Sequence, residues 1–129
     1  MNLGGVRLGK RQQIALVQHD VARAVPFYRD GLGLELQFEM DGLAFLDAGG
    51  VRLMLTRPSA PEFDHRNSIL YFDVADCAEA HADLTARGVP FDDAPHLVGK
   101  TATHEIWMAF CRDPEGNLIG IAEQRPLLP

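Results

Sequence analysis

The chain has 129 residues and a mass of 14.2 kDa, which suffices for one domain or for two small modules that share a core. Hydrophobic residues make up 47% and charged residues 23%, a balance typical of folded globular proteins rather than disordered or membrane proteins. With 18 Asp and Glu against 12 Lys and Arg, the net charge is −6, which disfavours nucleic acid as a partner because no broad positive surface is available for phosphates.

The N-terminal segment, residues 1–11, is glycine-rich and basic and contains no apolar run, so we expect a tail that is neither a signal peptide nor a membrane span. Two cysteines, Cys77 and Cys111, share no C-x-x-C spacing. We therefore expect reduced thiols, no disulfide scaffold, and a cytoplasmic protein that does not interact with a membrane.

A first unit is expected over residues 12–56. Residues 13–18 alternate in the manner of a strand, Asp20 can cap the helix that follows, and Gly33 can end it. Pro26 falls inside this helix and predicts a kink or an irregular first turn. Three short strands then follow, at 34–40, 43–48 and 51–56, separated by Asp41-Gly42 and Gly49-Gly50, which favour two-residue hairpins.

Residues 57–67 are rich in Pro, Ser, Asp and His and indicate a linker. A second unit, 68–124, repeats the order of the first: a strand at 68–74, the cap Asp76, and a helix at 77–87 that ends at Gly88. Its remaining strands are expected at 91–101, 104–112 and 118–123, with a tail at 125–129. The last two strands are joined by D-P-E-G-N, a sequence with the chemistry of a tight turn.

The two units are a weak internal repeat, since Asp20 and Asp76 occupy matching positions in A-L-V-Q-H-D-V-A-R-A-V and Y-F-D-V-A-D-C-A-E-A-H. We expect an α+β fold of two βαβββ modules, each with one sheet face under its helix and one open face. The open faces of the two mixed sheets are expected to form a cup-shaped cavity. The large apolar residues expected under the helices are Ile14, Leu16, Leu53, Leu55, Leu70, Phe72, Ile119 and Ile121.

The chain resembles the vicinal oxygen chelate superfamily, which includes glyoxalase I, fosfomycin and bleomycin resistance proteins, and extradiol dioxygenases. The resemblance is carried by I-A-L-V-x-H-D-V-x-R-A-V-x-F-Y-R-D-G-L-G-L, G-G-V-R-L-M-L, F-D-V-A-D and, most specifically, D-P-E-G-N followed by Leu-Ile. It covers residues 13–123. It implies the glyoxalase/bleomycin resistance fold and, by analogy with such modules, a homodimer.

In metal-using members of that superfamily, four strand positions supply the ligands. Matched by motif, these positions are Gln13, Met54, Ile69 and Gly120. Only Gln13 offers an oxygen donor, whereas an oxygen-rich divalent site needs several. The resemblance therefore implies the fold without its usual metal, and without the Lewis-acid chemistry that depends on it. We expect no cofactor.

The leading hypothesis is a metal-independent protein that binds a small aromatic or amphipathic molecule in the cup. Alternation in H-E-I-W-M-A-F-C-R predicts that Glu105 and Trp107 face the cup together with Ala109 and Cys111. Burial of the ligand would then involve apolar and aromatic side chains, with polar groups to orient it. The residues expected to bind the ligand are Gln13, Arg52, Met54, Ile69, Tyr71, Glu105, Trp107 and Gly120.

Two alternatives remain open at the level of sequence. One is a glyoxalase-type lyase/isomerase or dioxygenase that uses an atypical divalent metal held by Gln13, His104 and Glu105, with His96 and Cys111 nearby in the sequence. Against it, His104 and Glu105 are neighbours on a strand and point to opposite faces. The other alternative is a structural or regulatory module whose cavity is filled by its own side chains. Catalytic residues are not assigned.

Overall fold

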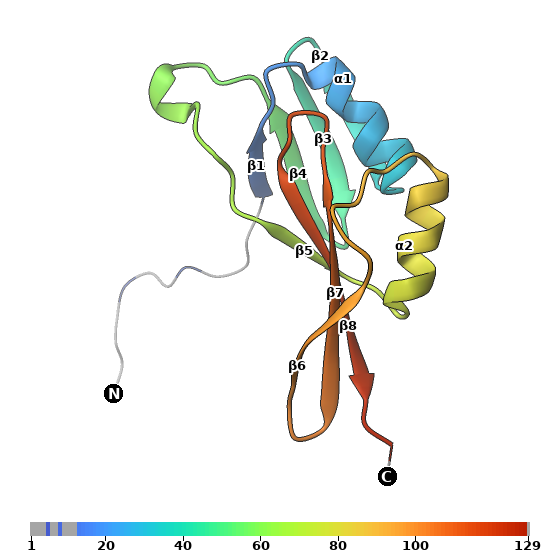
Figure 1. Cartoon of the computed structure of the whole chain (residues 1–129). Coiled ribbons are helices and arrows are strands. Elements are labelled where there is room, and N and C mark those ends of the chain that lie inside the picture. The colour runs from blue at the N-terminus through green and yellow to red at the C-terminus, as the bar shows by residue number, and fades with distance from the viewer. Residues whose placement is uncertain (1–4, 6–7, 9–12, 129) are drawn as a thin grey trace.

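The structure, a computed structural model that describes residues 5, 8 and 13–128, contains two four-stranded mixed sheets (Figure 1). The first sheet has the strand order β1-β4-β3-β2, in which β1 and β4 are parallel neighbours and the other pairs are antiparallel. Its strands are β1 (Gln13–Val17), β2 (Glu35–Met40), β3 (Leu43–Ala48) and β4 (Val51–Thr56). The N-terminal tail expected at 1–11 lies almost wholly outside the described residues.

The second sheet repeats this topology in the order β5-β8-β7-β6. Here β5 and β8 are parallel neighbours, and the other pairs are antiparallel. Its strands are β5 (Leu70–Asp73), β6 (His96–Lys100), β7 (His104–Arg112) and β8 (Leu118–Pro126). The α+β fold of two βαβββ modules expected from the sequence is thus confirmed. The hairpin at Asp41-Gly42 is also present, with Gly42 at a φ of +77° that favours glycine.

The strand expected over residues 91–101 is wrong in its first half. Phe91 makes only an isolated bridge with Cys111, and β6 begins at His96. The backbone amide of Phe110 donates a hydrogen bond of 2.9 Å to the carboxylate of Asp93. This side-chain acceptor replaces the backbone carbonyl that a paired strand would offer. Pro95 has no amide hydrogen to donate to a ladder. Regular pairing with β7 therefore starts only after Pro95.

Each module contributes one helix, capped as expected. Oδ1 of Asp20 accepts the amide of Arg23 at the start of α1 (Val21–Pro26), and Oδ1 of Asp76 accepts the amide of Glu79 at the start of α2 (Cys77–Ala86). The irregularity predicted from Pro26 lies in the second half of the first helix, where the chain widens into the π-helical segment η1 (Phe27–Gly31). No helix among the described residues is long and apolar enough to cross a membrane.

The core lies between the sheets and the two helices, which both pack on the same side of the molecule (Figure 1). The face expected to lie under the helices is confirmed: Leu16, Leu53, Leu55, Ile119 and Ile121 are buried, and Ile14, Leu70 and Phe72 pack against them. Residues 57–69, which include the short 3₁₀ helix η2 (Pro61–Phe63), run on the opposite side of the sheets (Figure 1). The open faces of both sheets therefore look toward the side of the linker.

Candidate functional site

The open face of the first sheet carries all three site residues predicted in the first module. In the parallel register of β1 and β4, Gln13 lies beside Arg52 and Ala15 lies beside Met54. The amide nitrogen of Gln13 is 3.7 Å from the sulfur of Met54, a distance suited to a weak hydrogen bond to a thioether. Phe45 of β3 pairs with Met54 and extends the apolar row across the sheet. The structure thus brings Gln13, Arg52 and Met54 together.

The linker and one end of this face together line a mainly apolar, open cavity of about 320 Å³. The floor is formed by open-face residues of β1 and β4, and one wall by the ring of Phe63 in η2. This volume lies at the small end of the range for small-molecule pockets. The residues that line the cavity are Ala15, Val17, Met54, Thr56, Arg57, Pro58, Ser59, Phe63 and His65.

Sequence reasoning missed Phe63 because it treated residues 57–67 only as a connection between modules. A signal was present. Phe63 is the one large hydrophobic side chain in a segment otherwise made of polar residues, Pro and Ala. Exposing such a ring to water is unfavourable in free energy, so a lone aromatic side chain in a polar segment often packs against another part of the protein. Here it lines the same cavity as residues of the open sheet face, although it keeps an exposed fraction of 52% in this isolated chain.

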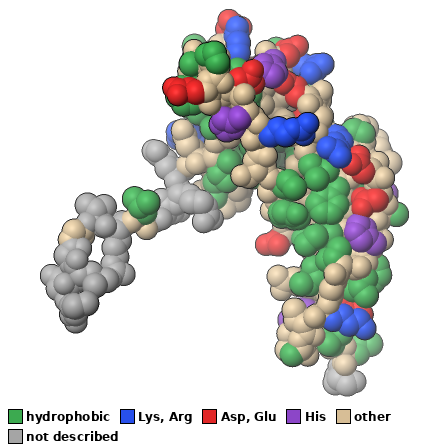
Figure 2. Space-filling model, turned by 60° about the vertical axis from the view of Figure 1, so that its left-hand side comes forward, with side chains coloured by type: hydrophobic (Ala, Val, Ile, Leu, Met, Phe, Trp, Pro, Cys, Tyr) green, Lys and Arg blue, Asp and Glu red, His purple; other side chains and the backbone are tan. Residues whose placement is uncertain are grey.

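The open face of the second sheet carries Tyr71, which lies beside Gly120 in the parallel register of β5 and β8. The ring of Tyr71 packs edge-to-face on Phe110, with ring centroids 5.9 Å apart. Ile69, just before β5, keeps an exposed fraction of 43%, and Tyr71 one of 53%. Figure 2 shows a band of hydrophobic side chains over the lobe formed by this sheet. This face is therefore apolar and uncovered in the single chain.

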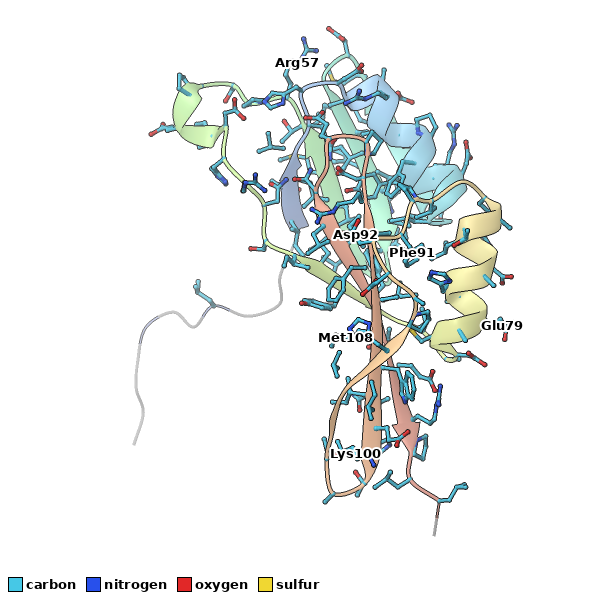
Figure 3. The ribbon with its side chains drawn as sticks, in the orientation of Figure 1. Arg57, Glu79, Phe91, Asp92, Lys100 and Met108 are labelled. Atoms are coloured by element: carbon cyan, nitrogen blue, oxygen red, sulfur yellow. The ribbon has the colours of Figure 1, made fainter. Side chains whose placement is uncertain are left out.

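The expectation that Glu105 and Trp107 face the cup is wrong. On β7, Ala109 pairs with Ile121 and Cys111 pairs with Ile119, and directly paired residues share a sheet face. Because Ile119 and Ile121 are buried under the helices, this set of β7 positions also points to the helix side. Trp107, two residues before Ala109, packs against the core. The open face of β7 instead carries Met108 and Phe110, and Figure 3 shows Met108 on the side of the second sheet opposite Phe91.

On the helix side, Trp107 and Glu105 form a polar and aromatic cluster of their own. The indole nitrogen of Trp107 donates to Oε1 of Glu105 at 3.2 Å, and the guanidinium of Arg125 lies 4.6 Å from the centre of the Trp107 ring. The other carboxylate oxygen of Glu105 is 3.7 Å from the ammonium of Lys100. These contacts account for both side chains without a ligand.

Arg52, for which the sequence left open a ligand contact or a position at the rim, is exposed in the structure. Its guanidinium carbon lies 4.7 Å from the centre of the Phe45 ring, in a cation–π contact on the open face. Arg52 also pairs in register with Asp47 of β3. The positive charge of Arg52 is therefore partly stabilised by the Phe45 ring. It remains available to contact a ligand at the edge of the apolar row.

The four positions that correspond to metal ligands in related proteins do not fit a divalent metal. Only Gln13 carries an oxygen donor, and the neighbour Met54 is a soft thioether. Gly120 has no room for a ligating side chain, since a Cβ there would lie 2.6 Å from Cδ1 of Tyr71. Across the described residues, no group of three or more His, Cys, Asp or Glu side chains is placed to hold a metal ion. Glu105 and His104 do not form such a group with Gln13, because Glu105 lies on the helix side.

The fold and this site define the class of protein. The sequence profile of the Glyoxalase/Bleomycin resistance protein/Dioxygenase superfamily matches residues 10–121, so the chain belongs to that superfamily. Among curated proteins, it is similar to the uncharacterized protein YraH of Bacillus subtilis (strain 168), with 31% identity over 127 residues that cover 87% of this chain and 96% of YraH.

Solved structures agree on the fold. A glyoxalase/bleomycin resistance protein/dioxygenase from Alicyclobacillus acidocaldarius superimposes with a TM-score of 0.71 at 20% identity, over 89% of this chain and 91% of the other. A structure described as lactoylglutathione lyase from Agrobacterium tumefaciens gives a TM-score of 0.68 at 24% identity, over 90% and 94% of the two chains. At these identities the likeness shows a shared fold and does not assign an activity.

Proposed function

We propose that this protein binds a small aromatic or amphipathic molecule on its open sheet faces without a metal ion. The observation that carries the proposal is the apolar cavity of about 320 Å³ between Met54 on the sheet and Phe63 on the linker. A mainly apolar cavity that the chain builds from two separate segments is better suited to a ligand than to a purely structural module.

Polar groups at the edge of the apolar row would orient the ligand. The amide of Gln13 and the guanidinium of Arg52 lie side by side in register on the open face, adjacent to Met54. Such groups discriminate between ligands because an unpaired buried donor is unfavourable. On the second sheet, Tyr71, Phe110 and Met108 offer further apolar surface beside Gly120.

We also propose a homodimer in which a second copy covers the open faces. Both helices lie on one side of the chain, so the two open faces look to the other side and leave Ile69 and Tyr71 exposed. Apolar faces of this kind are usually covered by a partner surface. The two open faces of one copy, placed against those of another, would complete the cup.

A cytoplasmic location fits the two free buried cysteines, Cys77 and Cys111.

The ligand proposal can be tested with 8-anilinonaphthalene-1-sulfonate, a fluorescent amphipathic probe, before a metabolite library is screened. Saturable binding is expected, and Met54→Ala should weaken it by roughly 5- to 30-fold because apolar contact area is lost. Leu127→Ala is the matched control, since Leu127 is apolar and 40% exposed but does not line the cavity. Equal affinity in wild type and Met54→Ala, or no saturable binding, would contradict the proposal.

Metal analysis separates this function from the metalloenzyme alternative. Protein purified without chelator should contain no stoichiometric metal, and probe binding should be unchanged by EDTA. Stoichiometric metal that is lost in Glu105→Ala would instead support an atypical metal site and a lyase/isomerase or dioxygenase activity.

Sedimentation equilibrium tests the dimer. We expect about twice the chain mass of 14.2 kDa. Tyr71→Arg should shift the equilibrium to the monomer because it places a charge in the covered apolar face. A wild-type protein that stays monomeric at high concentration would contradict the dimer and leave the cavity beneath Phe63 as the ligand site of the single chain.

A further inference from the structure

His19, which follows β1, connects three segments that are distant in the sequence. Its Nε2 is 2.8 Å from Oδ1 of Asp64 in the linker, and its Nδ1 is 2.8 Å from Oε1 of Glu115 in the turn between β7 and β8. The other carboxylate oxygen of Glu115 accepts the amide of Asp20 at 2.9 Å. One imidazole therefore stands between the first module, the linker and the second module.

The two neighbouring carboxylates favour the protonated form of this imidazole. Both partners are carboxylates, which accept hydrogen bonds and cannot donate when ionised. A neutral imidazole has one N–H and could satisfy only one of them, whereas an imidazolium donates from both nitrogens. The two contacts of 2.8 Å, one carboxylate beside each ring nitrogen, therefore favour the charged form of His19. Deprotonation would leave a nitrogen lone pair against a carboxylate.

The contact with Asp64 matters for the linker. Within the described part of the chain, it is the only hydrogen bond or ion pair from residues 58–66 to either module. The bonds of Phe63 and Asp64 amides to Ala60 and Pro61 stay inside the linker, and the next attachment is Asn67, whose side chain accepts the amide of Val17 at 3.0 Å. Phe63, the wall of the cavity, directly precedes Asp64.

We propose that protonated His19 is the positioning residue of the linker, holding Asp64 so that Phe63 closes the cavity over Met54, and that loss of the proton weakens this hold because a neutral ring keeps at most one of the two contacts. The clamp consists of His19, Asp64 and Glu115. It acts through Phe63 and does not touch the ligand. Its effect on binding rests on the proposed function, whereas its effect on the order of the linker does not.

The direction of the pH dependence follows from the charges around His19. Hydrogen bonding to Asp64 is the main cause that raises the pKa of His19, with Glu115 adding to it. The other charged or titratable groups lining the two hollows beside His19 are Asp20, Glu39, Asp41, Arg57, His65, Arg66 and Arg112. A raised pKa means that the stabilisation from the charged form of the clamp is fully present below the ordinary histidine pKa and is lost as the pH rises through the raised value.

NMR on the full-length protein tests the clamp without any ligand. The readouts are the titration of the His19 ring and the heteronuclear NOE of backbone amides 59–66, at about pH 6 and about pH 9, values on either side of the histidine range. In wild type, the linker amides should be more ordered at the lower pH than at the higher pH. In His19→Gln they should be mobile at both, and in Asp64→Asn the pKa of His19 should fall.

His96→Gln is the matched control, because His96 also lies beside a carboxylate, 3.2 Å from Asp93, but is not attached to the linker. It should leave the linker unchanged. A linker whose order is the same at both pH values in wild type, or is unaffected by His19→Gln, would overturn the proposal.

The same variants extend the test to ligand binding, again with 8-anilinonaphthalene-1-sulfonate, whose sulfonate stays ionised throughout. His19→Gln should weaken binding about two- to fivefold at the lower pH, the scale expected for an exposed ion pair, and should abolish the pH dependence. If the linker responds to His19 but probe binding does not, the clamp stands and the cavity is not the ligand site. If neither responds, the clamp is wrong.

Discussion

The hydroxyl of Tyr28 in η1 donates a hydrogen bond of 2.8 Å to Oδ2 of Asp113, although 85 residues separate the two in the chain. Both side chains are buried, and Gln18 donates to the same oxygen at 2.7 Å. The D-P-E-G-N turn of the second module is thereby fixed to the helix of the first. Asp113 also accepts the amides of Glu115 and Asn117, so the turn is ordered by the residue that joins the modules.

Tyr28→Phe tests this joint. The substitution removes one hydrogen bond to a buried carboxylate while the ring stays in place, so we expect a loss of about 1–3 kcal/mol in the free energy of unfolding by urea. Tyr71→Phe removes the hydroxyl of an exposed tyrosine and should change stability by less than about 0.5 kcal/mol. Similar values for the two variants would show that the hydroxyl of Tyr28 does not hold the modules together.

The stability of the protein should fall at acid pH through Glu123 on β8. Its buried carboxylate accepts from Nε of Arg125 and from the amide of Cys77, both at 2.9 Å, and these bonds lower the pKa of Glu123. Stability from this group is present above the ordinary glutamate pKa and is lost as the pH falls through the lowered value. The difference in unfolding free energy between wild type and Glu123→Gln should therefore shrink with falling pH. A difference that stays constant would contradict this account.

Both thiols should resist modification in the folded protein. Cys77 and Cys111 are completely buried, and burial raises the pKa of Cys111 to about 11. Since the thiolate is the reactive form, a disulfide reagent such as Ellman's reagent should release almost no chromophore from native protein and two equivalents in denaturant. Fast reaction of one thiol in the native state would mean that the core under α2 opens locally.

The close contact between Gly120 and Tyr71 can be measured with a double-mutant cycle. A Cβ at Gly120 would lie 2.6 Å from the Tyr71 ring and 3.1 Å from the Phe110 ring, so Gly120→Ala must displace Tyr71. We expect a loss of about 1–3 kcal/mol, the usual scale of overpacking. In a Tyr71→Ala background the same substitution should be nearly neutral, which gives a coupling energy between the two positions. Additive effects would show that the ring has no defined place on the open face.

Local chemistry was enough to predict much of the fold. The caps Asp20 and Asp76, the hairpin at Asp41-Gly42 and the alternation in residues 13–17 and 51–56 depend on neighbours in the chain. The same alternation placed Gln13, Arg52 and Met54 on one open face. It failed for β7, where both sets of alternate residues contain large apolar side chains.

The sequence by itself determined the two βαβββ modules and their buried faces, because those properties follow from side-chain periodicity. The four strand positions came from the resemblance to the superfamily, and their residue types alone made them unsuited to a divalent metal. Only the tertiary structure decided that Trp107 points to the helices, since that choice depends on the register of β7 against Ile119 and Ile121 of β8. It also decided that Phe63 walls a cavity and that His19 meets Asp64 and Glu115. Contacts between segments this far apart are set by how the modules and linker pack, which no local pattern records.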